Sequence, residues 1–292
     1  MTPECSLTVH QLLTFYLEAG IDCALVDDPV DRLSVEDVAP ARLVPAARAA
    51  DNAPLSALAS MKPGASDKPR PIIKVEVSPD IAIGAADELA KSATTLDGLR
   101  AALAAFDGCT LKPTATQLVF ADGNPLAKIM FVGEAPDRDE DIEGRPFMGQ
   151  TGKLFDLMLA AIGLNRTNTY LANVIPWRPP GNRTPTPVET KTCLPFIRRQ
   201  IELVNPDVLV VLGNSPCQSL LGSRDGIMKA HGRWTEYDTG TRKIRAVATF
   251  HPLHLLQHPS YKRMAWQDLQ AIAKVLQEVT AAPEAVLPTP GE

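Results

Sequence analysis

Four short segments of this 292-residue chain concentrate side chains that can transfer protons, form directed hydrogen bonds or hold phosphate. They are GEAPDRDED from Gly133, NVIPWRPPGNR from Asn173, GNSP from Gly213 and HPLHLLQHPSYKR from His251. Carboxylates, a carboxamide and an imidazole suit acid–base chemistry and the reading of a polar ligand edge. The three histidines of the last segment are weak evidence for a metal, because no Cys or carboxylate there completes a ligand set.

Each of these segments follows a short apolar run, and the runs alternate with helical patterns. Strands are expected at 128–133, 169–175, 207–213 and 243–250, and helices at 95–106, 151–164, 186–204, 215–222 and 261–279. This alternation predicts a three-layer α/β/α sandwich with a central, mainly parallel four-stranded sheet. Such sheets bind ligands at the carboxyl ends of their strands, so the four segments should meet at one edge.

The composition changes along the chain and predicts four regions. Residues 1–26 carry an amphipathic helical pattern at 7–20, and residues 27–92 are rich in Ala, Pro and Asp without a sustained period. We therefore expect a largely disordered linker at 27–92, with an Ala-rich helical insert as the alternative. The α/β domain should span 93–280 and be followed by a frayed tail at 281–292.

Charge and cysteine content restrict the classes of protein. The net charge is −5, but residues 1–108 hold 16 acidic and 9 basic side chains, whereas residues 145–275 hold 8 acidic and 17 basic ones. A basic C-terminal half suits phosphate binding, although it is also common on surfaces that bind nothing. No apolar run is long enough for a membrane span, the start lacks a secretory pattern, and the five cysteines suggest no disulfide framework. A cytoplasmic protein without membrane contact is expected.

Four segments, in their order along the chain, resemble the uracil-DNA glycosylase superfamily, most closely its family four. They are FVGEAPDRDEDIEGRPFMGQTGKL, NVIPWRPPGNRTPTPVE, VVLGNSP and HPLHLLQHPSYKRMAWQDL. The resemblance covers roughly residues 93–280. It implies an enzyme that flips uracil out of DNA and hydrolyses its N-glycosidic bond, leaving abasic DNA. Uracil-containing DNA and the abasic product are then the expected partners of a monomeric protein.

The resemblance assigns roles to four substrate-facing residues. Phe147 would stack on the flipped uracil, and Asn173 would pair with its Watson–Crick edge, which rejects the reversed donor pattern of cytosine. His251 would donate toward uracil O2, where negative charge develops, and the backbone around Ala135 would offer N–H groups to the same oxygen. The alternatives are a core phenylalanine at 147 and an asparagine at 173 that satisfies only backbone groups.

The acid that positions the attacking water is less clearly marked. Ala135 stands where the best-studied glycosylase family carries an aspartate, and Asp137 stands where family four generally has glycine. We rank Asp137 first as the catalytic acid and Glu134 second. The alternative is that Asp137 is a loop residue without a catalytic role.

Basic and apolar residues near these segments are the candidates for DNA contact. Leu255 or Leu256 would wedge into the duplex as the base leaves, and the expected phosphate or backbone contacts are Arg178, Asn182, Arg183, Lys262 and Arg263. For each basic residue the alternative is a solvated surface charge.

Family four usually holds a [4Fe–4S] cluster through four cysteines, and this chain departs from that pattern. Cys109 and Cys193 match two ligand positions, whereas Lys112 and Trp177 occupy the other two. Cys5 and Cys23 would substitute only if the N-terminal helix folded back. We therefore expect no metal and no cofactor, with Cys109 and Cys193 as remnants of a cluster site.

The leading hypothesis is a monofunctional uracil-DNA glycosylase without lyase activity, because no lysine is marked as a Schiff-base nucleophile. Two alternatives stay open. One is a module that binds uracil or abasic DNA with little turnover, which Asp137→Asn would separate from an enzyme. The other is a glycosylase for a different deaminated base.

Overall fold

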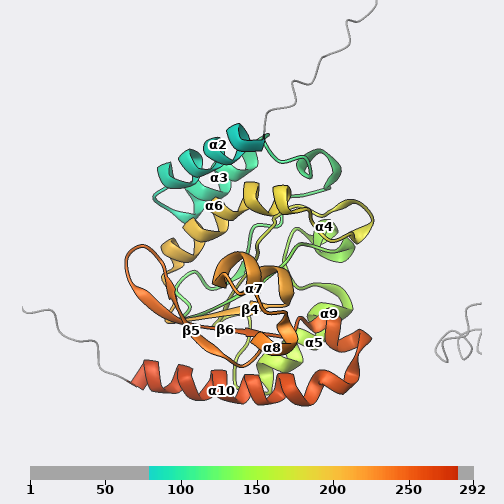
Figure 1. Ribbon diagram of the computed structural model, residues 1–292, viewed down its shortest axis with the longest axis vertical. Coiled ribbons are helices and arrows are strands. Elements are labelled where there is room, and N and C mark those ends of the chain that lie inside the picture. The colour runs from blue at the N-terminus through green and yellow to red at the C-terminus, as the bar shows by residue number, and fades with distance from the viewer. Residues whose placement is uncertain (1–78, 282–292) are drawn as a thin grey trace, which may run out of the picture. The chain divides into compact units, whose positions relative to one another are not determined.

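The computed structural model describes residues 79–281. Its centre is a six-stranded sheet in the order β1-β3-β2-β4-β6-β5 (Figure 1). The strands are β1 (Asp122–Gly123), β2 (Ile129–Gly133), β3 (Tyr170–Asn173), β4 (Val208–Leu212), β5 (Trp234–Asp238) and β6 (Lys243–Thr249). The inner four pair in parallel, and β1 and β5 add an antiparallel edge strand on either side.

The α/β class and the four parallel strands are thus confirmed, and the sheet is wider than expected by two edge strands. Sequence patterning missed both for physical reasons. β1 is a two-residue bridge, and β5 exposes most of its side chains, so neither carries an apolar run.

Helices cover both faces of the sheet. They are α2 (Pro79–Ser92), α3 (Leu96–Ala105), α4 (Arg138–Glu143), α5 (Gly149–Ala160), α6 (Pro187–Val204), α7 (Asn214–Leu221), α8 (Ile227–Ala230), α9 (Pro252–Gln257) and α10 (Lys262–Ala281). Three short 3₁₀ turns lie at Lys112–Thr114, Pro180–Asn182 and Pro259–Tyr261. In Figure 1, α2, α3 and α6 lie on one side of the sheet and α5 and α10 on the other.

Two apolar cores sit against the two faces, because successive side chains of a strand point to opposite sides. In β2, Met130 and Val132 join the core under α3 and α6, whereas Ile129 and Phe131 join the core under α5 and α10. All five residues of β2 and of β4 are buried, as a doubly covered parallel sheet requires.

The helix α2 corrects the expected linker at 27–92. Ala82, Ala86 and Ala90 recur every fourth residue and are buried, so this stretch packs a flat alanine face onto the domain. The alternative reading, an Ala-rich helix, holds for 79–92. The α/β domain therefore begins earlier than residue 93. The expected helix at 7–20, the rest of the linker and residues 282–292 lie outside the described part of the chain.

Within residues 79–281, no helix is both long and apolar enough to cross a membrane.

Candidate active site

The segments singled out in the sequence follow β2, β3, β4 and β6 and meet at one edge of the sheet. Parallel pairing sets Gly133 of β2 opposite Asn173 of β3, and Leu212 of β4 opposite Thr249 of β6. The strand ends are therefore level, and the residues after them share a common region. The chain switches sides between β3 and β4, which flank β2, and such switch points form binding crevices.

Gly133 brings the candidate base-reading residues together. A Cβ at this position would lie 2.3 Å from Asn173 Oδ1 and 2.9 Å from Phe147 Cζ. Only glycine leaves room for the carboxamide and the ring at this distance. Asn173 is 4% exposed, and its Nδ2 makes no hydrogen bond of normal geometry among the described residues, although it lies near enough to the Glu140 carboxyl to favour the ionised form of that group. A buried, unpaired amide of this kind is what a ligand acceptor would satisfy.

The ring of Phe147 is fully buried. It stacks on Phe155 with centroids 4.5 Å apart and lies 5.8 Å from the ring of His251. Phe147, Asn173 and His251 therefore come together from three separate segments of the chain. Phe147 also has a positive φ of 56°, an unusual backbone conformation for a residue with a side chain.

The imidazole of His251 has a defined acceptor side. His251 caps α9, and its Nδ1 accepts the backbone N–H of Leu253 at 3.2 Å. The proton of the neutral ring then lies on Nε2. Burial, aided by nearby His254, lowers the pKa of His251 to about 4, so the ring is a neutral donor at physiological pH.

The two candidate acids have different surroundings. Asp137 caps α4, and its Oδ1 accepts the N–H groups of Asp139 at 2.9 Å and Glu140 at 3.1 Å. Glu134 has a buried Oε1 with no hydrogen-bond partner among the described residues, and burial raises the pKa of its carboxyl. Of the two, Glu134 carries the buried oxygen that lacks a partner among the described residues. Ala135 is partly buried and packs against the core on the α6 side of the sheet.

Glu140 is a site residue that sequence reasoning missed. Its buried carboxylate accepts the backbone N–H of Phe147 and, at 2.6 Å, that of Asp137. Burial raises its pKa to about 7. The D-x-x-E spacing of Asp137 and Glu140 is a capping-box signal and could have revealed both the helix and this role.

The end of β6 is fixed to α10 by a second buried acid. Asp268 Oδ2 accepts the Thr249 hydroxyl at 2.7 Å, and His231 Nδ1 lies 3.2 Å from both carboxylate oxygens of Asp268. Thr249 lies two residues before His251. This network therefore anchors the strand end from which His251 emerges.

The structure corrects one of the expected wedge residues. Leu255 is 1% exposed and belongs to the core under α5 and α10, so it cannot enter a DNA duplex. Leu256 is 37% exposed, and Leu253, which was not considered, is 43% exposed. Both lie on α9, so the helical turn exposes Leu253 and Leu256 and turns Leu255 inward.

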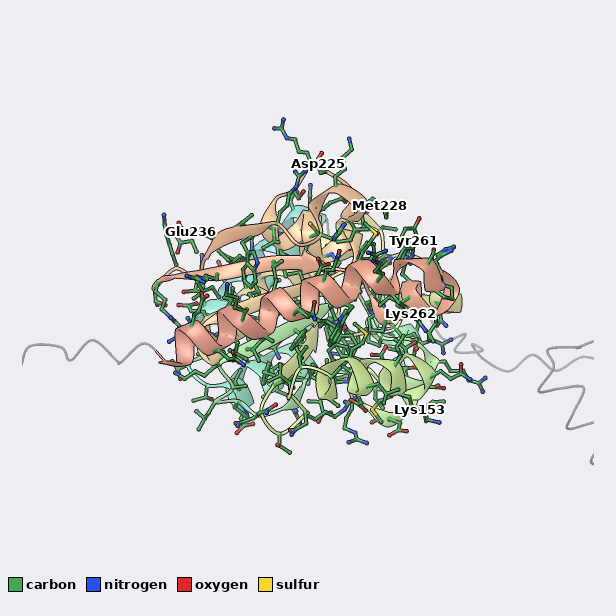
Figure 2. The ribbon with its side chains drawn as sticks, turned by 90° about the horizontal axis from the view of Figure 1, so that it is seen from below. Lys153, Asp225, Met228, Glu236, Tyr261 and Lys262 are labelled. Atoms are coloured by element: carbon green, nitrogen blue, oxygen red, sulfur yellow. The ribbon has the colours of Figure 1, made fainter. Side chains whose placement is uncertain are left out.

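Some of the expected phosphate contacts already pair with other side chains of the protein, and others are exposed to solvent. Arg183 forms a two-pronged ion pair with Glu189, at 2.6 and 2.9 Å, and Arg178 Nε donates to Asn182 Oδ1 at 2.7 Å. Lys262 and Arg263 are exposed at the start of α10. Figure 2 shows Lys262 and Lys153 at the same end of the molecule.

The residues at the four cluster positions do not form a four-thiolate set. Cys193 donates a hydrogen bond to Cys109, with the sulfurs 3.7 Å apart, and this bond lowers the pKa of the Cys109 thiol. Lys112 Nζ binds Asp107 at 2.6 Å, and Trp177 is buried in the same core as the two cysteines. Residues 79–281 hold no group of three or more metal-ligating side chains. Cys5 and Cys23 lie outside the described residues.

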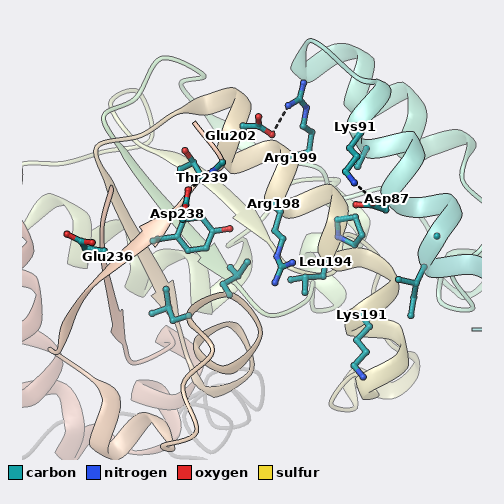
Figure 3. A pocket seen from close by; sticks show the side chains of 18 of the residues that line it. Asp87, Lys91, Lys191, Leu194, Arg198, Arg199, Glu202, Glu236, Asp238 and Thr239 are labelled. Carbon is teal, nitrogen blue, oxygen red and sulfur yellow. Dashed lines mark hydrogen bonds and ion pairs between the residues drawn. The ribbon is translucent and has the colours of Figure 1, made fainter. Parts of the chain in front are cut away.

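A groove of about 900 Å³ lies elsewhere, between α2, α6 and the turn after β5 (Figure 3). Two ion pairs lie in it: Asp87 pairs with Lys91 at 2.5 Å, and Arg199 pairs with Glu202 at 2.6 Å. None of the candidate site residues at the ends of β2, β3, β4 and β6 lines this groove.

Comparison with known proteins identifies the class of the chain. Residues 120–270 match the model of the uracil DNA glycosylase superfamily. The chain is 39% identical over 171 residues to the type-4 uracil-DNA glycosylase of Archaeoglobus fulgidus, a match that spans 57% of this chain and 86% of that protein. It is also 39% identical over 165 residues to the type-4 uracil-DNA glycosylase of Thermotoga maritima, spanning 56% of this chain and 84% of that protein.

The chain therefore belongs to the uracil DNA glycosylase superfamily. Its relatives in Sulfurisphaera tokodaii and Saccharolobus solfataricus are likewise type-4 uracil-DNA glycosylases, at 36% and 34% identity. The resemblance to family four is thereby confirmed.

Proposed function

We propose that this protein is a monofunctional uracil-DNA glycosylase, which hydrolyses the bond between uracil and deoxyribose and leaves an abasic site. The observation that carries the proposal is that Asn173 and Phe147 meet at Gly133 and that the ring of His251 lies 5.8 Å from the ring of Phe147, with Nδ2 of the buried Asn173 left without a partner among the described residues. Family membership and type-4 relatives support the same activity.

Recognition of the base rests on Asn173 and Phe147. Uracil offers an N3–H donor and an O4 acceptor, which complement the oxygen and nitrogen of one carboxamide. Cytosine reverses this pattern and would leave buried polar groups unpaired, which is costly. The face of Phe147 would stack on the extruded ring.

Departure of the base rests on His251. Cleavage of the glycosidic bond places negative charge on the uracil ring, near O2. The Nε2–H of a neutral, fixed imidazole stabilises that charge without a proton transfer, and a desolvated setting strengthens the interaction. Backbone N–H groups around Ala135 would add further donors.

We assign the water-positioning carboxylate to Glu134 in preference to Asp137. The unpaired buried oxygen of Glu134 is available to hold a water, whereas Oδ1 of Asp137 already accepts two N–H groups as a helix cap. The side chains at this edge are carboxylate, amide, phenyl and imidazole, which supports hydrolysis over Schiff-base chemistry.

Contact with DNA would involve the exposed face around α9 and the start of α10. Leu253 and Leu256 are the apolar wedge, and Lys262 and Arg263 hold phosphate. The loop after β3 carries Arg178, Asn182 and Arg183. Its hydrogen bond between Arg178 and Asn182 and its ion pair between Arg183 and Glu189 hold the loop in position. The enzyme would act in the cytoplasm as a monomer and retain contact with its abasic product.

We further propose that the enzyme works without an iron–sulfur cluster, because two of four ligand positions hold Lys112 and Trp177. Iron and acid-labile sulfide measured on the purified protein test this. Their absence is expected, and a brown protein with stoichiometric iron would overturn it.

Activity is tested with labelled duplexes that contain uracil, hypoxanthine, xanthine or a thymine mismatch, followed by alkali. Strand breakage after alkali at uracil alone, and none without alkali, is expected. Tight binding to uracil DNA without breakage would favour the binding module instead. Breakage at another base would favour a different substrate.

A further inference from the structure

The backbone of Phe147 is held at both of its peptide groups by two charged side chains. Its positive φ of 56° is disfavoured for a residue with a Cβ and persists only where neighbouring groups enforce it. Such strain at a residue whose ring faces the site points to a function in placing that ring.

The first hold is on the N–H of Phe147. Glu140 accepts this N–H with Oε1 and uses Oε2 for the N–H of Asp137 at 2.6 Å. One buried carboxylate thereby ties Phe147 to the loop after β2, which carries Glu134. Glu140 is 5% exposed, and both of its oxygens are occupied by backbone donors.

The second hold is on the carbonyl of Phe147. Arg166 Nη2 donates to this carbonyl, and Nη1 donates to the carbonyl of Pro146 at 3.2 Å. The guanidinium is itself fixed by Asp122 at 2.6 Å and Asp156 at 2.8 Å. These acids lie on β1 and α5, so Arg166 connects the turn before α5 to two elements of the domain.

Helix α5 packs directly against the carbonyl group of Phe147. A Cβ at Gly152 would lie 2.0 Å from the Phe147 carbonyl oxygen, and the Gly152 N–H bonds the Met148 carbonyl. The turn that carries Phe147 therefore packs against the start of α5, and Arg166 binds the carbonyl oxygens of this turn.

From this geometry we infer that Glu140 and Arg166 are positioning residues, which fix the backbone of Phe147 so that its ring stands ready to stack on the extruded base. The inference rests on the proposed function. Arg166 lies before β3 and donates to the backbone carbonyls of Phe147 and Pro146, so we expect it to act on catalysis through the placement of Phe147.

Lysine at position 166 keeps the charge but cannot hold two carbonyls and two carboxylates at once. We expect Arg166→Lys to lower kcat for uracil release by about tenfold to a hundredfold, with KM changed much less, because misplacement of a catalytic group costs rate. Glu140→Gln, which replaces one acceptor by a donor, should lower kcat in the same way. Arg245→Lys, at a surface ion pair with Glu278, is the matched control and should retain wild-type kcat.

A double-mutant cycle with Phe147→Ala separates positioning from general damage. If Arg166 acts through the ring, Phe147→Ala/Arg166→Lys should be no slower than Phe147→Ala alone. Multiplied losses in the double variant, or an unchanged kcat in folded Arg166→Lys, would overturn the inference. Thermal melts of each variant verify folding, and Glu140→Gln supplies the same cycle if Arg166→Lys does not fold.

Failure of the proposed function is distinguishable from failure of this inference. If the wild type releases no uracil, the same cycle is measured as affinity for an oligonucleotide with non-cleavable 2′-fluoro-2′-deoxyuridine, relative to the thymidine equivalent. Loss of that preference in Arg166→Lys, absent on a Phe147→Ala background, supports positioning. A preference unchanged by Arg166→Lys contradicts it.

Discussion

Nδ1 of His251 accepts the backbone N–H of Leu253 at 3.2 Å, so the single proton of the neutral ring is on Nε2. The first turn of α9 thus selects the tautomer in which the opposite nitrogen can donate to a leaving base. Helix capping and catalysis are served by the two nitrogens of one ring.

The pH profile of kcat/KM follows from this arrangement. Because the pKa of His251 is lowered to about 4, the neutral donor persists well below the ordinary histidine pKa of 6.5. We expect no loss of kcat/KM attributable to His251 near 6.5 and a loss as pH falls toward 4. An inflection near 6.5 that disappears in His251→Asn would contradict the neutral-donor role.

Gly133→Ala should disable the site while the fold survives. Its Cβ would lie 2.3 Å from Asn173 Oδ1 and 2.9 Å from Phe147 Cζ, so the amide and the ring must separate. We expect uracil release to fall by about a hundredfold or more. Gly84→Ala, on α2 with open space around it, is the control and should leave activity unchanged. Equal activity of the two variants would show that the site tolerates the methyl group.

Glu140 should make stability depend on pH in a direction opposite to the usual carboxylate. Its pKa is raised from 4.5 to about 7 by burial and then by the negative charge of Asp137, so the native state holds this proton more tightly than the unfolded chain does. Its contribution is present below about pH 4.5 and is lost as pH rises toward about 7. In urea unfolding at about pH 5 and about pH 8, Glu140→Gln should remove part of this loss. Exposed Glu143→Gln should retain it, and identical profiles for the two variants would contradict the assignment.

Three leucines of α9 should separate packing from DNA insertion. Leu255→Ala removes a buried side chain and should cost about 2–4 kcal/mol of unfolding free energy. Leu253→Ala and Leu256→Ala, on the exposed face, should cost about 0.5 kcal/mol or less. The exposed pair should slow uracil release from duplex more than from single-stranded DNA, because only duplex demands base extrusion against stacking. Equal slowing on both substrates would argue against a wedge.

The sequence predicted the parallel sheet because the apolar runs IMFV before Gly133 and VLVVL before Gly213 are strong strand signals. It also indicated which segments carry the site, since parallel strands bring their carboxyl ends together. It offered an Ala-rich helix in this stretch only as the alternative to a linker, because the alanine face of α2 lacks the large apolar side chains of an amphipathic pattern. Leu255 was misassigned because burial within one helical turn depends on what packs beneath it. Arg166 was missed because it binds backbone carbonyls across the domain, and no local pattern marks such contacts.

The central claim is that the buried carboxamide of Asn173 reads uracil in a site built with Phe147 and His251. Its most direct test is the release of free base from matched uracil and cytosine oligonucleotides by the wild type and Asn173→Asp, with affinity for abasic duplex measured alongside. The account predicts uracil release by the wild type, none of cytosine, and a loss of about a hundredfold or more in Asn173→Asp at unchanged abasic affinity. Uracil release by Asn173→Asp at the wild-type rate would contradict it.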